Sequence, residues 1–296
     1  MTGYALAVLA VYAIIGAAVG AFAVPRIADM LLSRAYLRSY TWWYRCLDDL
    51  SCYRDAFPGR LPRQSEKGSA GAVGMWLEDC RSQALKGTLT HERAEALREA
   101  GIDVGKGSSA RSEAEQRRRC SFSARAWQRA VLAAAMALWF AAQPLSGAPW
   151  HQGCLLCVCG AVMASGVVCD LRARVIPLEC CAALLVVGGA YQLLRYGSAG
   201  IAEGAVAAAV VLAVCWVANL IARKSGGSVG FGDIRCMTAL AFACGPATLL
   251  GAAACYASAC AFSLAGMLVH RLGRRDGIPM APFLSIWLAV GTTVLG

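Results

Sequence analysis

The chain has 296 residues, of which 58% are apolar and 16% are charged, and its mean hydropathy is +0.53. A soluble domain averages about 25% charged residues. Residues 25–125 hold 18 of the 28 basic and 13 of the 18 acidic residues, so charge is concentrated in one region. This distribution excludes a disordered chain, a collagen-like fibre and a secreted disulfide scaffold. It predicts a membrane protein with one soluble insert.

Residues 4–24 predict the first transmembrane helix, because they form a run of uncharged, mostly apolar residues about as long as a bilayer is thick. No basic residue precedes the run, whereas Arg26, Arg34 and Arg38 follow it. A cleaved signal peptide has its basic residues on the other side. We therefore expect residues 1–24 to be an uncleaved helix with its N-terminus outside the cell.

Residues 25–125 form the predicted insert, which carries a net charge of +5 and has a stretch rich in Pro, Gly and Ser over 57–74. Its clearest helix is 90–100, with Thr90 as N-cap and Gly101 just past the C-terminus. The insert ends in a basic group, which comprises Arg111, Arg117, Arg118, Arg119 and Arg125. We expect these arginines to contact anionic lipid headgroups. They have no interleaved aromatic residues, so no nucleic-acid partner is predicted.

Fifteen cysteines are present, and eleven of them lie in apolar segments, where a thiol packs as a small hydrophobic group. The four in polar sequence are Cys46, Cys52, Cys80 and Cys120. They contain no C-x-x-C pair, which a compact zinc site would require. A four-thiolate zinc site could then form only by long-range assembly of these cysteines. The sequence predicts no metal, and it predicts no cofactor because the carboxylate chemistry described below needs none.

Seven apolar segments follow the insert, at 127–147, 150–169, 178–194, 200–222, 234–245, 247–270 and 278–296. With the first helix they predict an all-α membrane protein of about eight transmembrane helices, in which 126–296 form a seven-helix membrane domain. An external N-terminus places the insert and the basic loops on the cytoplasmic side of the plasma membrane, as the positive-inside rule requires. The segment 234–245 is shorter than the ~20 residues of a straight span, so its full crossing stays open.

Two acidic residues in the membrane half lack an ordinary surface explanation. Asp170 and Asp233 each lie at the cytoplasmic end of an apolar segment, where an ionisable group is costly unless it is paired or functional. Two carboxylates that approach closely cannot both ionise easily, so one holds a proton while the other is a base for activating water. A helix cap is the alternative reading of either residue alone. Glu203, at a helix start, and Asp276, among arginines in a loop, read as surface residues.

The neighbours of each aspartate favour the functional reading. Asp170 is followed by a short basic stretch and Ile176-Pro177, which suits the first turn of a helix. Asp233 closes G-F-G-D, whose glycines let the backbone bend and lie close to an extended peptide. The predicted catalytic residues are Asp170 and Asp233, and the predicted substrate-loop residues are Ile176, Pro177, Gly230 and Gly232.

With these motifs the sequence resembles the type IV prepilin peptidase family of membrane aspartic proteases. The family combines an aspartate and Ile/Leu-Pro with G-x-G-D and a later I-P-x-x-P, which here is Ile278–Pro282. The resemblance covers about residues 150–296. It implies an aspartic endopeptidase that cleaves basic leader peptides from type IV pilin-like precursors at the cytoplasmic face of the membrane, in a pilus or protein-secretion system.

The N-terminal half departs from that family. Bifunctional members carry an Asn-containing motif at the end of the first helix and paired C-x-x-C zinc motifs, whereas this chain has Gly20–Val24 and no paired cysteines. We therefore expect neither a structural zinc nor N-methyltransferase activity. Leu178 stands where the family tends to have an acidic or polar residue, and Glu179 follows it.

Two other function classes are considered. A proton-coupled transporter or ion channel uses intramembrane carboxylates, but it predicts acidic residues near the bilayer midplane and repeated helices, and the sequence has neither. A non-catalytic scaffold of a pilus, secretion or competence system would not need both aspartates and the glycine loop. The expected partners are pilin-like precursors and the lipid membrane. Which precursor is cleaved, and whether the chain forms a homo-oligomer, stay open.

Overall fold

The computed structural model describes residues 3–63, 65–85, 87–103, 112–146, 149–224, 230–269 and 278–293. All regular elements in these ranges are helical. The chain divides into two compact units. We call Met1–Leu31 with Phe122–Gly296 the apolar unit, and Leu32–Ser121 the insert unit.

Among the described residues, four helical stretches are long and apolar enough to cross a membrane: Ala5–Ala56, Trp150–Ala173, Leu178–Ala222 and Phe231–Leu268. Two of them are interrupted. Gly197 has a non-helical backbone (φ 66°, ψ −150°) inside α8 (Leu178–Lys224), and Gly245 (φ 53°) follows α9 (Phe231–Cys244). The helical segments therefore follow the expected apolar segments, whereas eight full crossings stay a prediction.

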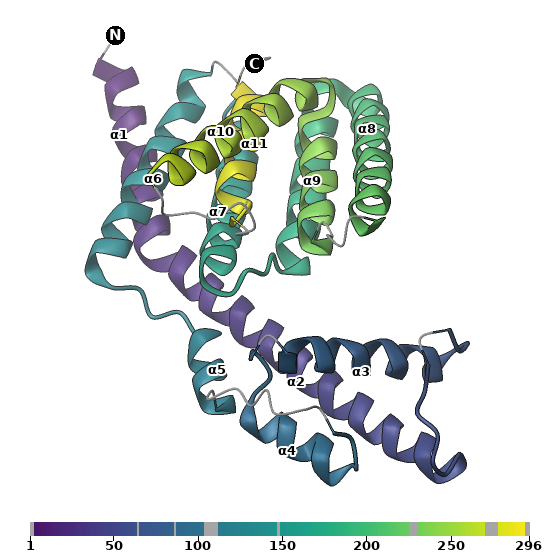
Figure 1. Ribbon diagram of the computed structural model, residues 1–296. Helices are drawn as coiled ribbons and strands as arrows, with labels where there is room; N and C mark the ends of the chain where they lie inside the picture. The colour runs from purple at the N-terminus through teal and green to yellow at the C-terminus, as the bar shows by residue number, and fades with distance from the viewer. Residues whose placement is uncertain are drawn as a thin grey trace. The chain divides into compact units, whose positions relative to one another are not determined.

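The first helix does not end near residue 24, where we expected the insert to begin. Helix α1 (Gly3–Ala18) continues through a π-helical turn (Val19–Ala23) into α2 (Val24–Ala56). The π turn ends just before Pro25, which has no N–H to donate to the preceding turn. Helix α1 packs beside α6 (Ala126–Leu145) (Figure 1).

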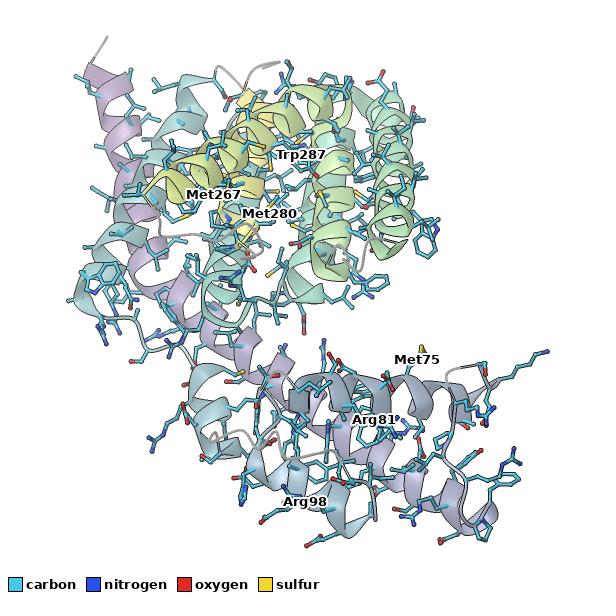
Figure 2. The ribbon with its side chains drawn as sticks, viewed as in Figure 1. Met75, Arg81, Arg98, Met267, Met280 and Trp287 are labelled. Carbon is cyan, nitrogen blue, oxygen red and sulfur yellow. The ribbon has the colours of Figure 1, made fainter. Side chains whose placement is uncertain are left out.

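Close helix packing in the apolar unit depends on small residues. A Cβ atom added to Gly20 would lie 2.2 Å from the carbonyl oxygen of Leu132, which limits the distance between the first helix and α6. Helix α9 packs along α8, and α10 (Thr248–Leu268) packs against α11 (Ala281–Thr293) (Figure 1). A Cβ on Gly251 would lie 2.4 Å from Cδ1 of Trp287, a fully buried residue of this core (Figure 2).

The insert unit has its own core. The C-terminal part of α2 packs with α3 (Ser69–Leu85) and α4 (His91–Glu99) around Trp43, Trp76 and Leu97. The two tryptophan rings meet edge to face, with 5.4 Å between centroids. The expected helix at 90–100 is confirmed, because α4 begins after Thr90 and ends in a turn closed by Ile102 N–H donating to the carbonyl of Leu97.

A buried ion pair joins α4 to α5 (Glu113–Arg119). The guanidinium of Arg93 lies 2.9 Å from Glu113 Oε1, and both side chains are largely buried. Arg93 also lies over the ring of Trp43. The hydroxyl of Thr90 does not cap α4 and instead donates to Glu113 Oε2 at 2.8 Å. These contacts fix the start of α5 to the core of the insert unit.

Candidate active site

Asp170 lies in the last turn of α7 (Trp150–Ala173) and is only 5% exposed. Arg174 ends this helix in the left-handed conformation (φ 56°, ψ 38°), and its N–H donates to the carbonyl of Asp170 at 2.8 Å. A non-glycine residue is uncommon there. The turn sends the chain into the buried Ile176-Pro177, after which α8 begins.

The side chain of Asp170 is held by the start of α11. Its Oδ2 accepts a hydrogen bond of 2.9 Å from the backbone N–H of Ala281, the first residue of that helix. Free N–H groups at a helix N-terminus are natural donors to a carboxylate. Ala281 belongs to the Ile278–Pro282 motif, so this bond joins the first and last motifs of the sequence.

Asp233 lies in the first turn of α9 and is partly buried. Gly230 precedes the helix, and a Cβ atom placed on it would lie 2.9 Å from Asp233 Oδ2. A Cβ atom on Gly232 would lie 3.5 Å from both the Cβ and the carbonyl oxygen of Ile176. The glycine turn is therefore packed against the connection between α7 and α8.

The structure brings all six predicted site residues to one end of the helices of the apolar unit. This end comprises the C-terminus of α7 and the N-termini of α8, α9 and α11. The contacts of Asp170 with Ala281 and of Gly232 with Ile176 bring the segments that carry the two aspartates to this end of the unit. Two carboxyl groups that lie close together can divide the roles of base and proton donor, because both do not ionise easily.

Sequence reasoning missed the part played by Ala281. The missed group is a backbone N–H, which no side-chain pattern identifies. The available signal was the I-P-x-x-P motif around it. Of the other acidic residues, Glu179 is partly buried and Glu203 is exposed, whereas Asp276 lies outside the described residues. Arg111 and the arginines next to Asp276, which are Arg271, Arg274 and Arg275, also lie outside the described residues.

The cysteines of the insert unit occupy different environments. Cys46 and Cys80 are buried in its core, Cys52 is exposed and Cys120 is partly buried. Burial raises the pKa of Cys80 to about 12. Within the described residues, no group of three or more His, Cys, Asp or Glu side chains is placed to hold a metal ion. The expected absence of zinc stays a prediction.

Comparison with known proteins gives one match. The model of the type IV leader peptidase family matches residues 154–294. This range contains both aspartates, the glycine turn and the I-P-x-x-P motif, and it leaves out the insert unit. No curated protein and no solved structure matches the chain.

Proposed function

Because the model of the type IV leader peptidase family matches residues 154–294, we propose that this chain is a membrane aspartic endopeptidase. Its substrates are type IV pilin-like precursors, from which it removes a basic leader peptide at the cytoplasmic face of the cell membrane. Asp170 and Asp233 are the catalytic residues of this proposal. It includes no metal, no cofactor and no N-methyltransferase activity.

One observation carries the proposal: the hydrogen bond from Ala281 N–H to Asp170 Oδ2. It brings together motifs that are 111 residues apart in the chain. It also orients the Asp170 carboxylate from outside its own helix, because the donor is the first N–H of α11. The contact of Gly232 with Ile176 supports the same grouping, since it brings the turn that carries Asp233 to the connection that follows Asp170.

The proposed reaction needs only two carboxyl groups and water. The ionised carboxylate takes a proton from a water molecule, whose oxygen attacks the carbonyl carbon of the leader peptide bond. The protonated partner donates a hydrogen bond to the carbonyl oxygen. The C–N bond then breaks as the leaving nitrogen takes the proton that the carboxylate removed from water, which leaves the pair with one shared proton, as at the start. Gly230 and Gly232 shape the turn that admits the substrate strand.

The decisive test replaces each aspartate by asparagine. Asp170→Asn and Asp233→Asn keep size and polarity but remove the shared proton, so each variant should lose almost all cleavage of a co-expressed pilin-like precursor. The double variant should be scarcely worse than either single one, because residues that act as a unit are strongly non-additive. Cleavage is read from the mobility shift of the precursor.

The matched controls are Glu179→Gln and Asp276→Asn, which remove other carboxylates of the same half of the chain and should cost far less activity. Each variant is compared at equal amounts of membrane-inserted protein. Substantial cleavage by either aspartate variant at a normal protein level would contradict the aspartic mechanism.

A further inference from the structure

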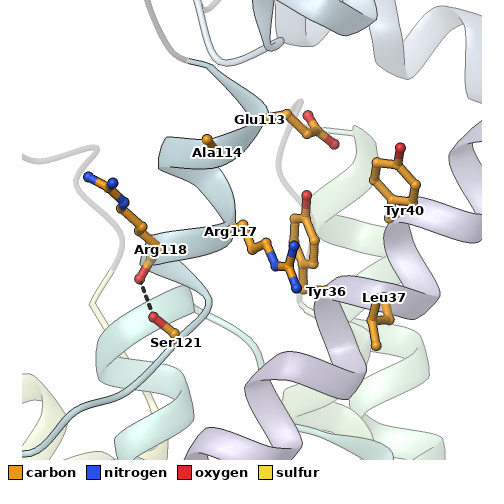
Figure 3. A pocket seen from close by; sticks show the side chains of 8 residues that line it. All are labelled: Tyr36, Leu37, Tyr40, Glu113, Ala114, Arg117, Arg118 and Ser121. Atoms are coloured by element: carbon orange, nitrogen blue, oxygen red, sulfur yellow. Dashed lines mark hydrogen bonds between the residues drawn. The ribbon is translucent and has the colours of Figure 1, made fainter.

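A cavity of about 710 Å³ lies within the insert unit, between α2 and α5 (Figure 3). This volume is in the range of sites that hold small molecules or headgroups. Tyr36, Leu37 and Tyr40 line it from α2, and Glu113, Ala114, Arg117 and Arg118 line it from α5, with Ser121 just beyond that helix. The proposed peptidase reaction uses none of these residues.

The side chains give the cavity a polar part and an apolar rim. The hydroxyl groups of Tyr36 and Tyr40 and the carboxylate of Glu113 point toward one another (Figure 3). Arg117 extends toward Tyr36, whereas Arg118 extends away from the two tyrosines (Figure 3). Leu37, 55% exposed, adds an apolar rim beside the aromatic rings.

The charge balance favours an anion. The carboxylate of Glu113 already pairs with Arg93 at 2.9 Å and accepts a hydrogen bond from Thr90 at 2.8 Å. That negative charge is therefore compensated within the fold. Arg117 is exposed, and its guanidinium supplies a positive charge suited to hydrogen bonding with phosphate. An aromatic and apolar wall beside a guanidinium suits a ligand that is both anionic and amphipathic.

The connections of the cavity to the apolar unit are short. Tyr36 belongs to α2, a helix that begins inside the apolar unit, and Ser121 stands five residues before α6 begins. We propose that this cavity binds the headgroup of an anionic phospholipid, with the phosphate on Arg117 and the glycerol region against Leu37 and Tyr40. This proposal differs from a diffuse attraction between the arginines of α5 and the bilayer. It predicts that Arg117 contributes more to lipid binding than the neighbouring Arg118 does.

The test uses the full chain in lipid nanodiscs and measures amide hydrogen exchange of α5. Replacing phosphatidylcholine by a mixture that contains phosphatidylglycerol should slow exchange in α5 by about fivefold, the effect of one arginine near an anionic headgroup. Arg117→Gln should abolish this slowing. Arg118→Gln is the matched control. Arg118 also lines the cavity, but its side chain extends away from the two tyrosines, so this variant removes the same charge and should keep most of the slowing.

A second control, Arg98→Gln, removes an exposed arginine of α4 that lies outside the cavity (Figure 2), and it should leave the slowing unchanged. If exchange in α3 shows that Arg117→Gln unfolds the insert unit, Arg117→Lys replaces it. Lysine keeps the charge but loses the paired donors, so a reduced slowing is expected.

Three results would overturn the proposal. Equal exchange in the two lipid compositions would exclude headgroup binding. Equal losses in Arg117→Gln and Arg118→Gln would reduce the effect to diffuse attraction. Slowing by inorganic phosphate alone, at millimolar concentration in phosphatidylcholine nanodiscs, would assign the cavity to a soluble anion instead.

Discussion

Gly230 stands where an added methyl group would meet the carboxylate that we propose as catalytic. A Cβ at this position would lie 2.9 Å from Asp233 Oδ2, while the backbone itself is extended and accepts any residue (φ −62°). Gly230→Ala should therefore turn Asp233 without unfolding the chain. We expect a loss of cleavage of up to about 100-fold, as for a catalytic group displaced by about 1 Å.

Gly232→Ala is the matched comparison. Its added Cβ would reach Ile176 at 3.5 Å, which is ordinary contact, so this variant should keep most of its cleavage. Both variants are assayed with the same co-expressed precursor and at equal protein levels. If Gly232→Ala proved much worse than Gly230→Ala, substrate contact rather than the orientation of Asp233 would explain the glycine turn.

Gly197 separates α8 into two apolar stretches, which match the two segments expected from the sequence. Its backbone angles (φ 66°, ψ −150°) are accessible almost only to glycine, and an added Cβ would meet no neighbouring atom within 4 Å. Gly197→Ala should therefore destabilise the chain by backbone strain alone, by about 1–3 kcal/mol. Thermal unfolding in detergent measures the effect, and Ser198→Ala in the following stretch should change stability little.

The buried ion pair between α4 and α5 leads to a prediction about how these two helices are held together. Arg93→Gln leaves the Glu113 carboxylate without its cation in a site where both side chains are at most 15% exposed. The expected loss of insert-unit stability is about 3 kcal/mol. Protease resistance of the insert in the full chain reports this loss.

The control for that change is an exposed pair of the same helix. His91 and Glu95 lie 3.1 Å apart, and their side chains are 56% and 54% exposed. Glu95→Gln should change stability by less than about 0.5 kcal/mol. If the two variants were equally resistant to protease, the buried pair would not hold α5 in place.

The apolar helices were predictable because long uncharged runs have few alternatives to a buried or membrane-spanning helix. The continuation of α2 to Ala56 could not be predicted in the same way, because the arginines and aspartates of this segment resemble a polar loop in sequence. The helix is stabilised by one buried face, which includes Trp43, Cys46 and Leu50. Thr90 shows the same limit, since its hydroxyl bonds Glu113 rather than capping α4. Such choices depend on tertiary contacts that local sequence does not contain.

The side chains of the proposed site could be predicted from the sequence, whereas the backbone group that contacts them could not. Asp170, Asp233 and their glycine and proline neighbours stand out because charge and chain-bending residues are rare in an apolar half. Their grouping required the fold. The N–H of Ala281 carries no signal of its own, because any residue except proline supplies the same donor.

At the scale of the whole molecule, the distribution of basic residues predicts an external N-terminus and a cytoplasmic insert. Lys67→Cys is placed in a background in which the exposed thiols are replaced, Cys52→Ser, Cys154→Ser and Cys260→Ser, so that it is the exposed thiol of the insert. An impermeant maleimide should fail to label it in intact cells and should label it after permeabilisation. Cys80 should stay unlabelled in both, because it is buried and its pKa is about 12. Labelling of Lys67→Cys in intact cells would reverse the topology.

The bond between Asp170 and Ala281 also sets an order of events during biosynthesis. The donor is translated 111 residues after its acceptor, which at roughly 5–20 residues per second is a delay of roughly 6–22 seconds. During that interval α7 and α9 can already be inserted while Asp170 lacks the N–H that orients it. On the proposed mechanism, a chain that is still being synthesised is therefore inactive. It becomes able to cleave its substrate only when α11 has emerged and Ala281 can orient Asp170.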